Sequence, residues 1–515
     1  MDAVSVRCEA TPEVERPNVR RGIPADPCVM VIFGAAGDLT RTELLPSLYE
    51  LHRKQLLPDA FAVIGFSRRQ WSVEQFRDEM RGAVEKSCGK LRNWDEFARR
   101  LSFVSGDATS APGDGYAALE DEIDRMRSAL TIPDNILFHL AVPPSLFDVI
   151  VARLGASGLA KSAHRWRRVV VEKPFGENRA SAHALTRKLR EVFEEDQIYR
   201  IDHYLGKETV QNMLVFRFAN PSFEPVWNRN YIDHVQITAA EDVGIGKRAT
   251  LYDRIGVVRD MIQNHLLQLV CMTAMEPPVR FDAGSLRDET VKVLEAVTVV
   301  PVDIECGSAR GQYGKGTVGG TRVRGYREEE GVPRRSNTAT FAAIKLTLDN
   351  WRWADVPFYL RTGKRLTRKL TEVAIQFKPT PHLMFAVEGS RPRHQSTLVF
   401  ELQPEEGIVQ TLAAKQLGPE LTLRPVTMDF RYAEAFGIEE PPRAYAWLLL
   451  DVMQGNQTLF ARADWIDKAW EIVDPIVERW ESEPPRDFPN YAAGAAGPEA
   501  AVELMRRDGR QWRAL

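Results

Sequence analysis

The sequence feature that most constrains the fold is an apolar run, a glycine turn and an amphipathic helix in direct succession near the N-terminus. Val29 to Phe33 is continuously apolar, as is typical of a strand covered on both faces in a parallel sheet. The sequence GAAGDL follows at 34–39, and apolar residues then recur at helical spacing as far as Leu51. This order predicts the first strand–turn–helix unit of an α/β domain.

Three further short strands are expected, each with a similar apolar run. They are expected at 61–69, 135–144 and 167–176, with charge-rich helical segments between them. Strands that alternate with helical patterns indicate βαβ units and a doubly wound sheet. We therefore predict a Rossmann-type dinucleotide-binding domain at residues 27–200.

The second half of the chain has a different pattern. Strand-like runs that often alternate polar and apolar residues are expected at 233–241, 338–348, 356–363, 371–378 and 396–402. This pattern is typical of an antiparallel sheet with one covered face, and helical stretches at 252–275 and 445–480 would cover it. The Gly- and Arg-rich segment Gly307 to Asn337 is expected to be a long surface loop. Residues 201–515 are therefore predicted to form a larger α+β domain with a mainly antiparallel sheet.

Composition excludes several classes of function. A net charge of -3 with 27% charged residues gives no electrostatic footprint for nucleic acid or an anionic membrane. The five cysteines form no CxxC pair, and the nine histidines form no HxH or HExxH spacing, which argues against disulfide frameworks and metal sites. Neither a signal peptide nor a spanning apolar run is expected. We predict a cytoplasmic protein with no nucleic-acid or membrane partner and no metal.

The glycine turn at 34–39 is a candidate phosphate site. Backbone N–H groups at the start of a helix can approach a pyrophosphate where glycines leave room, although GxxG also occurs in plain tight turns. The next strand ends in Ser67, Arg68 and Arg69, with no acid to hold ribose hydroxyls. An arginine there suits a 2′-phosphate, so NADP is favoured and NAD remains possible. Alternatively, these arginines are solvated loop charges. The candidate cofactor-binding residues are Gly34, Ala36, Gly37, Asp38, Leu39, Arg68 and Lys173.

The stretch RIDHYLGKETVQN at 200–212 gathers chemically diverse side chains. It offers the carboxylate of Asp202, the imidazole of His203, the phenol of Tyr204 and the ammonium of Lys207. Consecutive residues fan out on a regular helix or strand, whereas an irregular loop closed by Gly206 would aim them into one cleft. The alternative is a polar turn that caps a helix starting near Lys207.

Two other segments carry candidate catalytic groups. Lys173 of EKPFG (172–176) follows the fourth strand, at the sheet edge where such folds bind ligands, although a surface Lys-Pro turn is the simpler alternative. His265 lies in the largely apolar helical stretch 259–268, where a lone histidine is more often a core residue. Asp260 is about 140° away round a helix and so a poor partner for it, which leaves Asp202 as the best candidate. A carboxylate that raises the pKa of His265 and holds its tautomer would make it a suitable general base.

These stretches together resemble the glucose-6-phosphate dehydrogenase family over nearly the whole chain. The matching segments are 34–39, 172–176, 200–212, 223–237, 259–268, 350–366 and 448–465. RIDHYLGKE is highly specific to that family, and GxxGDL is much less so. The resemblance implies oxidation of glucose 6-phosphate at C1 to the 6-phosphogluconolactone, the first step of the pentose phosphate pathway, with NADP or NAD accepting the hydride. It also implies a homodimer or homotetramer.

The resemblance also implies roles for individual residues. His265 would take the proton of the C1 hydroxyl, and Asp202 would orient its imidazole. His203, Tyr204, Lys207 and Lys369 would hold the sugar phosphate. Glu241 and Asp260 would bind sugar hydroxyls, and Lys173 and Lys364 would lie near the sugar and the nicotinamide. Cations that bind a remote phosphate can help to align C1 with the nicotinamide.

Two segments depart from the family pattern. Where many members carry a basic cluster, this chain has Arg41, Thr42 and Glu43. Thr40 and Glu43 fit a capping box, but a carboxylate there would also oppose an anionic phosphate. At 246–253 the chain reads GKRATLYD where the family usually has a glutamate followed by GRGG. Both departures are expected to affect affinity more than the proton-abstracting centre.

Two other functions remain as alternatives. An oxidoreductase of the Gfo/Idh/MocA class would also join a dinucleotide-binding domain, an EKP segment and an α+β domain, but it would act on a sugar or polyol without phosphate. A non-catalytic substrate sensor could keep the same fold. The Gfo/Idh/MocA class lacks RIDHYLGKE, which argues against the first alternative. A sensor would not need the catalytic candidates that this chain keeps together, namely Asp202, His203, Lys207 and His265, which argues against the second.

Overall fold

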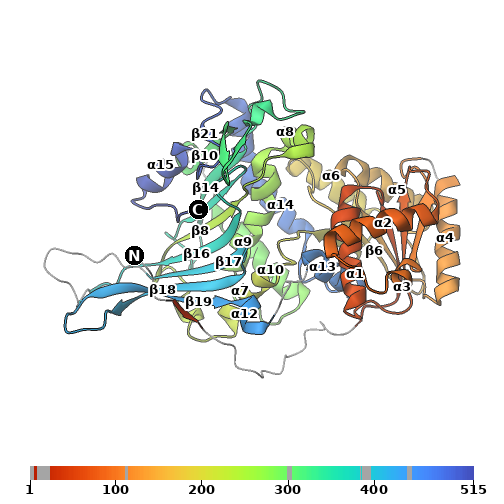
Figure 1. Cartoon of the computed structure of the whole chain (residues 1–515), viewed down its shortest axis with the longest axis horizontal. Helices are drawn as coiled ribbons and strands as arrows, with labels where there is room; N and C mark the ends of the chain where they lie inside the picture. Colours follow the sequence, from red (N-terminus) through yellow and green to blue (C-terminus); the bar gives the residue numbers. More distant parts are fainter. Residues whose placement is uncertain are drawn as a thin grey trace.

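The computed structural model describes residues 5–7, 24–110, 114–298, 304–382, 384, 396–437 and 443–515. Figure 1 shows an α/β lobe, coloured red to orange, beside a long sheet that is mostly cyan and blue. A layer of helices that includes α9, α10 and α14 lies between the two. Both parts of the predicted fold class are confirmed.

The N-terminal lobe is built on a seven-stranded sheet. Its strands are, in spatial order, β20 (Phe460–Ala461), β7 (Ile198–Ile201), β6 (Arg167–Val171), β5 (Ile136–Leu140), β2 (Cys28–Phe33), β3 (Phe61–Ser67) and β4 (Leu101–Ser105). All neighbours are parallel except β20 and β7. Every residue of β2 is buried, as its continuous apolar run predicted for a strand with helices on both faces.

The helices of this lobe connect successive strands. They are α1 (Leu45–Arg53), α2 (Val73–Cys88), α3 (Trp94–Ala98), α4 (Asp114–Leu130), α5 (Phe147–Ala156) and α6 (Arg179–Arg190). Two elements from the far end of the chain complete the lobe. Strand β20 extends the sheet at β7, and α13 (Ala444–Gln454) packs against α1. The elements at 444–454 and 460–461 therefore return to the lobe that 27–200 begins.

The second sheet is larger and mainly antiparallel. Its order is β1 (Ser5–Arg7), β19 (Leu423–Arg431), β18 (Gly407–Lys415), β17 (Thr397–Gln403), β16 (Leu370–Phe377), β8 (Ile232–Ala240), β15 (Phe358–Gly363), β14 (Phe341–Leu348) and β10 (Ser308–Gly311). Strand β9 (Val297–Thr298) also pairs with β14. The central pair β8 and β15 is parallel, so both strands end at the same edge of the sheet.

The helical layer differs in detail from the prediction. It contains α7 (Glu208–Phe218), α8 (Ala249–Val257), the π-helical segment η6 (Val258–Leu266), α9 (Leu267–Ala274), α10 (Ala283–Glu295) and α14 (Ala463–Ser482). The expected helix at 252–275 is interrupted at Gly256, whose φ of 70° is left-handed. In the expected 445–480 stretch, α13 packs on α1, and α14 packs on η6, α6 and α10. Within that stretch, α13 therefore belongs to the N-terminal lobe, and α14 packs mainly on other helices rather than on the sheet.

The expected surface loop at 307–337 is wrong. The segment forms β10, β11 (Tyr313–Gly314), β12 (Gly316–Val318) and β13 (Thr321–Val323), and it buries Gln312, Tyr313 and Tyr326 completely. Strand β11 pairs with β21 (Tyr491–Ala492), and the tyrosine rings pack together. Two aromatic anchors thus hold a segment whose glycines and arginines are typical of a loop.

The remaining elements are short. They are η1 (Thr40–Leu44), η2 (Pro144–Leu146), η3 (Glu195–Gln197), η4 (Glu224–Val226), η5 (Gly246–Arg248), α11 (Ile304–Gly307), η8 (Tyr326–Glu328), α12 (Tyr432–Phe436) and α15 (Glu499–Arg507). No helix in the described ranges is both long enough and apolar enough to cross a membrane.

The turn after β2 depends on Gly34, which gives a testable expectation for stability. Its φ is +86°, and a Cβ there would lie 2.2 Å from the carbonyl oxygen of Ala141. Gly34→Ala should therefore lower the free energy of unfolding by about 3 kcal/mol or more, from backbone strain plus a rigid backbone clash. The matched control is Gly437→Ala, at a left-handed position with no atom within 4 Å, which should cost only about 1 kcal/mol. Equal losses in denaturant unfolding would contradict the clash.

Candidate active site

The glycine turn joins β2 to the first helix of the N-terminal lobe. The N–H of Gly37 donates to the carbonyl of Gly34 at 2.8 Å, and the N–H of Gly34 donates to Phe66 at the end of β3. The candidate cofactor residues 34–39 therefore lie at the carboxyl edge of the sheet, beside Arg68. The predicted capping box is wrong, because Leu39 is already helical and the Thr40 hydroxyl instead faces the Gly34 carbonyl at 3.4 Å. Burial raises the pKa of the Glu43 carboxyl group, so burial favours its neutral form over the charged form that would repel a phosphate.

The loop after β3 places several cations around one aromatic ring. Arg68 is exposed. The guanidinium groups of Arg41 and Arg69 lie 5.8 Å and 6.0 Å from the Trp71 ring, and Arg41 also pairs with Glu79 at 2.9 Å. The loop after β3 therefore contributes Arg68 and Arg69 and contains no acid, and Arg41 joins them from η1. An arginine at the end of this strand suits a 2′-phosphate.

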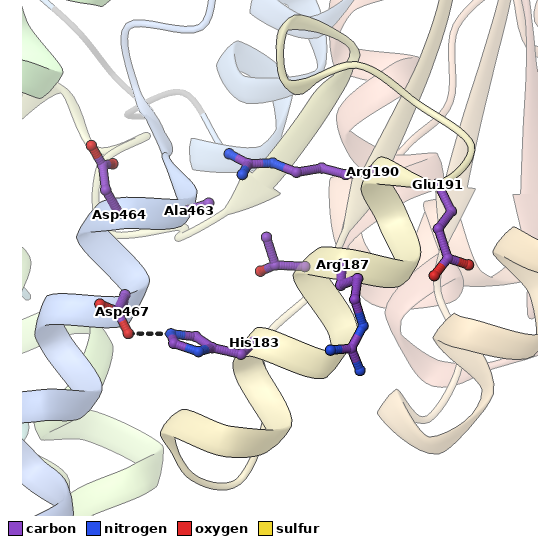
Figure 2. A pocket seen from close by; sticks show the side chains of 8 residues that line it. His183, Arg187, Arg190, Glu191, Ala463, Asp464 and Asp467 are labelled. Carbon is purple, nitrogen blue, oxygen red and sulfur yellow. Dashed lines mark hydrogen bonds and ion pairs between the residues drawn. The ribbon is translucent and has the colours of Figure 1, made fainter.

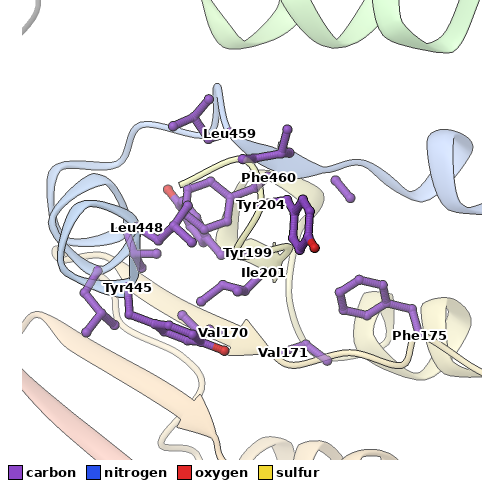
Figure 3. Close-up of a cluster of buried hydrophobic side chains, with 14 of the residues drawn as sticks. Val170, Val171, Phe175, Tyr199, Ile201, Tyr204, Tyr445, Leu448, Leu459 and Phe460 are labelled. Carbon is purple, nitrogen blue, oxygen red and sulfur yellow. The ribbon is translucent and has the colours of Figure 1, made fainter. Parts of the chain in front are cut away.

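The RIDHYLGK turn lies on an apolar base. Figure 3 shows Tyr199, Ile201 and Tyr204 beside Leu448 of α13 and Phe460 of β20. Gly206 is required by this packing, because a Cβ there would lie 2.7 Å from the carbonyl oxygen of Ala444. The C-terminal return of the chain, through α13 and β20, therefore holds the turn in place.

The turn brings Asp202 against His265. His265 Nδ1 lies 2.5 Å from Asp202 Oδ1, and the same oxygen accepts a hydrogen bond from the N–H of Tyr204 at 2.9 Å. On the other side of the ring, Lys173 Nζ lies 2.8 Å from His265 Nε2. The ammonium group is a donor and the carboxylate an acceptor, so these contacts favour a neutral imidazole with its proton on Nδ1. The Lys173–Pro174 peptide bond is cis.

The expected rise in the pKa of His265 is wrong. Burial lowers it well below the usual value, and the positive charge of Lys173 acts in the same direction. His265 is 1% exposed, so desolvation outweighs the neighbouring carboxylates. The consequence for chemistry is favourable, because a neutral imidazole keeps the Nε2 lone pair that a general base needs.

Asp260 also reaches Lys173, although it does not bond to His265 itself. Its carbonyl and Oδ1 lie 3.1 Å and 3.4 Å from Lys173 Nζ. Asp260 and His265 are five residues apart in η6, where i→i+5 hydrogen bonding replaces the α-helical pattern assumed from the sequence. Residues five apart therefore come onto one face of the segment, and both meet the same ammonium group.

Glu241 and Lys364 meet because two parallel strands end together. Ala240 of β8 is in register with Gly363 of β15, and each candidate residue directly follows its strand. Lys364 Nζ forms a close ion pair with Glu241 and lies 3.6 Å from Asp260 Oδ2. The cations Lys173 and Lys364 lower the pKa of Asp260 despite its burial. This end of the site is thus a fixed group of two carboxylates and one ammonium.

Lys207 has a different environment. It is 8% exposed, its ammonium has no hydrogen-bond partner among the described residues, and it lies 4.0 Å from the Tyr204 ring centroid. Burial and then the charge of Lys369 lower its pKa to about 7. Lys369 itself is exposed. Within the described part of the chain neither ammonium forms an ion pair, so the two cations suit an anionic ligand group.

His203 packs between other rings of the site. It meets His265 edge-on at 4.6 Å between centroids and lies parallel to Tyr445 at 6.4 Å. Asp202, His203 and His265 bring potential metal-ligating atoms within 4.8 Å of one another. The expectation that the site needs no metal therefore stays a prediction.

The structure adds a buried polar group that the sequence reading missed. Glu172 accepts a hydrogen bond from the Tyr445 hydroxyl at 3.1 Å, and its other oxygen lies 3.5 Å from His139 Nε2. Burial raises the pKa of Glu172 to about 8 and lowers that of His139 to about 3. Glu172 adjoins Lys173 in the sequence, but nothing in the apolar segments around His139 and Tyr445 signals this contact.

A groove of about 650 Å³ lies elsewhere, between α6 and α14. Figure 2 shows Arg187, Arg190 and Glu191 on one side and Asp464 and Asp467 on the other. His183 forms a close ion pair with Asp467 across it. The groove contains none of the candidate site residues, and its charges are mixed.

Family models match almost the whole chain. A model described as glucose-6-phosphate dehydrogenase, NAD binding domain, matches residues 31–212, and one described as glucose-6-phosphate dehydrogenase, C-terminal domain, matches residues 214–513.

Individual proteins agree with these matches. The chain is 46% identical over 494 residues to glucose-6-phosphate 1-dehydrogenase 2 of Mycobacterium tuberculosis, with 95% of each chain covered. It is 45% identical over 491 residues to glucose-6-phosphate 1-dehydrogenase of Aggregatibacter actinomycetemcomitans, with 95% of this chain and 98% of the relative covered. A solved glucose-6-phosphate dehydrogenase in complex with its substrate glucose-6-phosphate superposes with a TM-score of 0.85 at 33% identity, covering 96% of this chain and 99% of that one.

The buried Glu172 gives an expectation for the pH dependence of stability. The unfolded chain loses the Glu172 proton near pH 4.5, whereas the folded protein keeps it until about pH 8. Folding therefore takes up a proton in this window, and the carboxyl group lowers stability progressively as pH rises through it. Glu172→Gln keeps an acceptor for Tyr445 but cannot ionise. On going from about pH 6 to pH 8, the variant should gain roughly 2 kcal/mol relative to the parent. Parallel curves of melting temperature against pH would contradict this.

Proposed function

This chain belongs to the glucose-6-phosphate dehydrogenase family, and from that premise we propose that it oxidises glucose 6-phosphate at C1 to 6-phospho-D-glucono-1,5-lactone. The observation that carries the proposal is the neutral, buried His265 between Asp202 and Lys173. A base in this state can take a hydroxyl proton at neutral pH. The nicotinamide of the bound dinucleotide would accept the hydride from C1.

His265 is the proposed base and Asp202 its positioning residue. Nε2 takes the C1 hydroxyl proton, and the Asp202 carboxylate stabilises the imidazolium that results. In this structure Lys173 Nζ lies against Nε2, at the lone pair that the proton must reach. Binding of the sugar therefore requires the C1 hydroxyl to replace Lys173 there. Lys173 keeps its contacts with Asp260 and can turn toward the sugar or the cofactor.

The two ends of the site suit the two ends of the sugar. Glu241, Asp260 and Lys364 offer acceptors and a donor for ring hydroxyls. Lys207 and Lys369 offer positive charge for the phosphate, with His203 and Tyr204 beside them. A phosphate near Lys207 would restore the charged ammonium that burial disfavours, so both charges gain from the contact.

The N-terminal part is a nicotinamide-dinucleotide-binding domain, and we assign NADP as its preferred cofactor. Gly34 allows the tight turn between β2 and the first helix, because a Cβ there would clash with the Ala141 carbonyl, and the start of a helix after such a turn suits a pyrophosphate. Arg68 stands where NAD-specific enzymes place an acid, and Arg41 and Arg69 lie beside it at Trp71. Use of NAD at lower efficiency is compatible with this arrangement.

We also propose a cytoplasmic homodimer or homotetramer. The described cysteines, Cys28, Cys88, Cys271 and Cys306, are all free, as expected in a reducing compartment. Strands β18 and β19 form the long hairpin at the left of Figure 1, and they keep apolar side chains such as Met428 partly exposed, at 39%. An unpaired face of this kind is suited to association with a second copy.

The first experiment measures absorbance at 340 nm with glucose 6-phosphate or glucose, each with NADP and with NAD. Glucose 6-phosphate with NADP should react fastest, and glucose should react poorly because it cannot engage Lys207. Lys207→Ala should raise the KM for glucose 6-phosphate by about 100-fold and leave that for glucose almost unchanged, since a buried charge contact is lost. Fast turnover of glucose without phosphate would favour the Gfo/Idh/MocA alternative, and no turnover in any mixture would favour a sensor.

A second experiment tests the base. His265→Asn should lower kcat by about 10³-fold because the proton acceptor is lost, and it should leave glucose 6-phosphate binding nearly intact. His183→Asn is the matched control, because His183 also contacts a carboxylate, Asp467, but lies outside the site. Stopped-flow rates and equilibrium titration separate the two effects. Retention of most of kcat in His265→Asn would refute the base assignment.

A further inference from the structure

Tyr252 is a buried tyrosine in the segment 246–253, where the chain departs from the usual family pattern. It is 5% exposed, and its hydroxyl oxygen has no hydrogen-bond partner among the described residues. Three other buried tyrosines lie in the same cluster, and each has a partner. Tyr326 bonds to Asp253, Tyr313 to Glu329, and Tyr491 to the carbonyl of Lys364. A buried hydroxyl without a partner is uncommon in native proteins and calls for a specific explanation.

The side chain of Tyr252 lies beside the groups proposed to hold the sugar hydroxyls. Lys364 Nζ is 5.3 Å from the centroid of its ring, and this same ammonium links Glu241 and Asp260. After burial, the negative charge of Asp260 is the largest influence that raises the pKa of the Tyr252 hydroxyl, and Glu241 adds to it. The hydroxyl therefore stays protonated and keeps a hydrogen to donate.

The backbone explains why the charge of Asp260 acts on Tyr252. Helix α8 begins at Ala249, directly after η5. Gly256 then breaks the helix with a φ of 70°. A Cβ added at Gly256 would not clash with Thr338, so the backbone conformation rather than lack of space favours glycine there. The chain turns there and enters η6, so that residue 252 before the break and Asp260 after it face the same region. The segment thus keeps a shape that presents one side chain to the site.

We propose that Tyr252 is a specificity-determining residue, whose hydroxyl donates a hydrogen bond to a sugar hydroxyl on the C2–C3 side of the ring, beside Glu241 and Asp260. This inference rests on the proposed function, because it places C1 at His265. Lys173 contacts both His265 and Asp260, so the positions next to C1 fall at Asp260 and its neighbours. A hydrogen-bonding site of this kind rejects sugars that lack the hydroxyl, because its own donor would be left unpaired.

The test compares glucose 6-phosphate with its 2-deoxy and 3-deoxy analogues in the parent and in Tyr252→Phe. The parent should prefer glucose 6-phosphate over both. In Tyr252→Phe, kcat/KM for glucose 6-phosphate should fall by about 10-fold, while one deoxy analogue should lose almost nothing. The preference over that analogue should therefore shrink by about 10-fold, and the KM for the dinucleotide should not change.

The matched control is Tyr326→Phe. The Tyr326 ring lies 6.2 Å from that of Tyr252, but its hydroxyl serves Asp253. This variant should lose stability and keep the parent's preference among the three sugars. A Tyr252→Phe enzyme that loses kcat/KM equally for all three sugars would overturn the proposal, since a purely structural role has that result.

Calorimetric binding separates this inference from the proposed function. If the parent shows no turnover of glucose 6-phosphate, the proposed function fails, and titration of the three sugar phosphates still compares Tyr252→Phe with the parent. A reduced preference for the full set of hydroxyls supports the contact at Tyr252. Unchanged preference refutes it, whatever the turnover.

Discussion

The contact between Asp202 and His265 joins the two halves of the molecule at the point where the chemistry is proposed. Asp202 follows β7 of the N-terminal sheet, and His265 lies in the helical layer over the second sheet. One oxygen of Asp202 receives both the imidazole and the N–H of Tyr204, so the position of the base depends on the backbone of the RIDHYLGK turn. The RIDHYLGK turn is itself held by α13 and β20, two elements from the C-terminal part of the chain that pack against the N-terminal lobe. The base is therefore only as well placed as the packing between the two domains.

The remaining polar groups follow from where strands end. Lys173 follows β6, Glu241 follows β8, and Lys364 follows β15, each at the edge of its sheet. In the second sheet, the parallel pair β8 and β15 is what brings a carboxylate and an ammonium together, since an antiparallel neighbour would end at the opposite edge. The π-helical segment then adds Asp260 and His265 on one face. Functional sites often contain such segments, because an extra residue per turn redirects side chains without breaking the helix.

The sequence predicts these features unequally. The strand, glycine turn and helix at 29–51 are recognisable because burial on both faces leaves a continuous apolar run. The motif RIDHYLGKE indicates the family, and its Asp202, His203 and Tyr204 contact His265. Strand β20 has two residues and no periodic pattern, so its return to the first sheet leaves no signal. The π-helical segment has the composition of an α-helix, and the tyrosines of 307–337 are hidden among glycines and arginines. The lowered pKa of His265 does not follow from the sequence, because the sequence shows the neighbouring carboxylate but not the burial that outweighs it.

The charges of the site differ between its two ends. At one end, Lys364 is neutralised by Glu241 and Asp260, so an anion would meet carboxylates there and be repelled. At the other end, Lys207 is buried with no hydrogen-bond partner among the described residues, and burial and the charge of Lys369 lower its pKa to about 7. Tyr204 contacts both Lys207 and His265 through one ring, at 4.0 Å and 4.2 Å, which fixes the separation of the cation and the base. Under the proposed function, a sugar phosphate would place its anion at Lys207 and its ring hydroxyls at the carboxylates. That orientation would bring C1 to His265, so the charge pattern proposed to select the substrate would also align it for proton transfer.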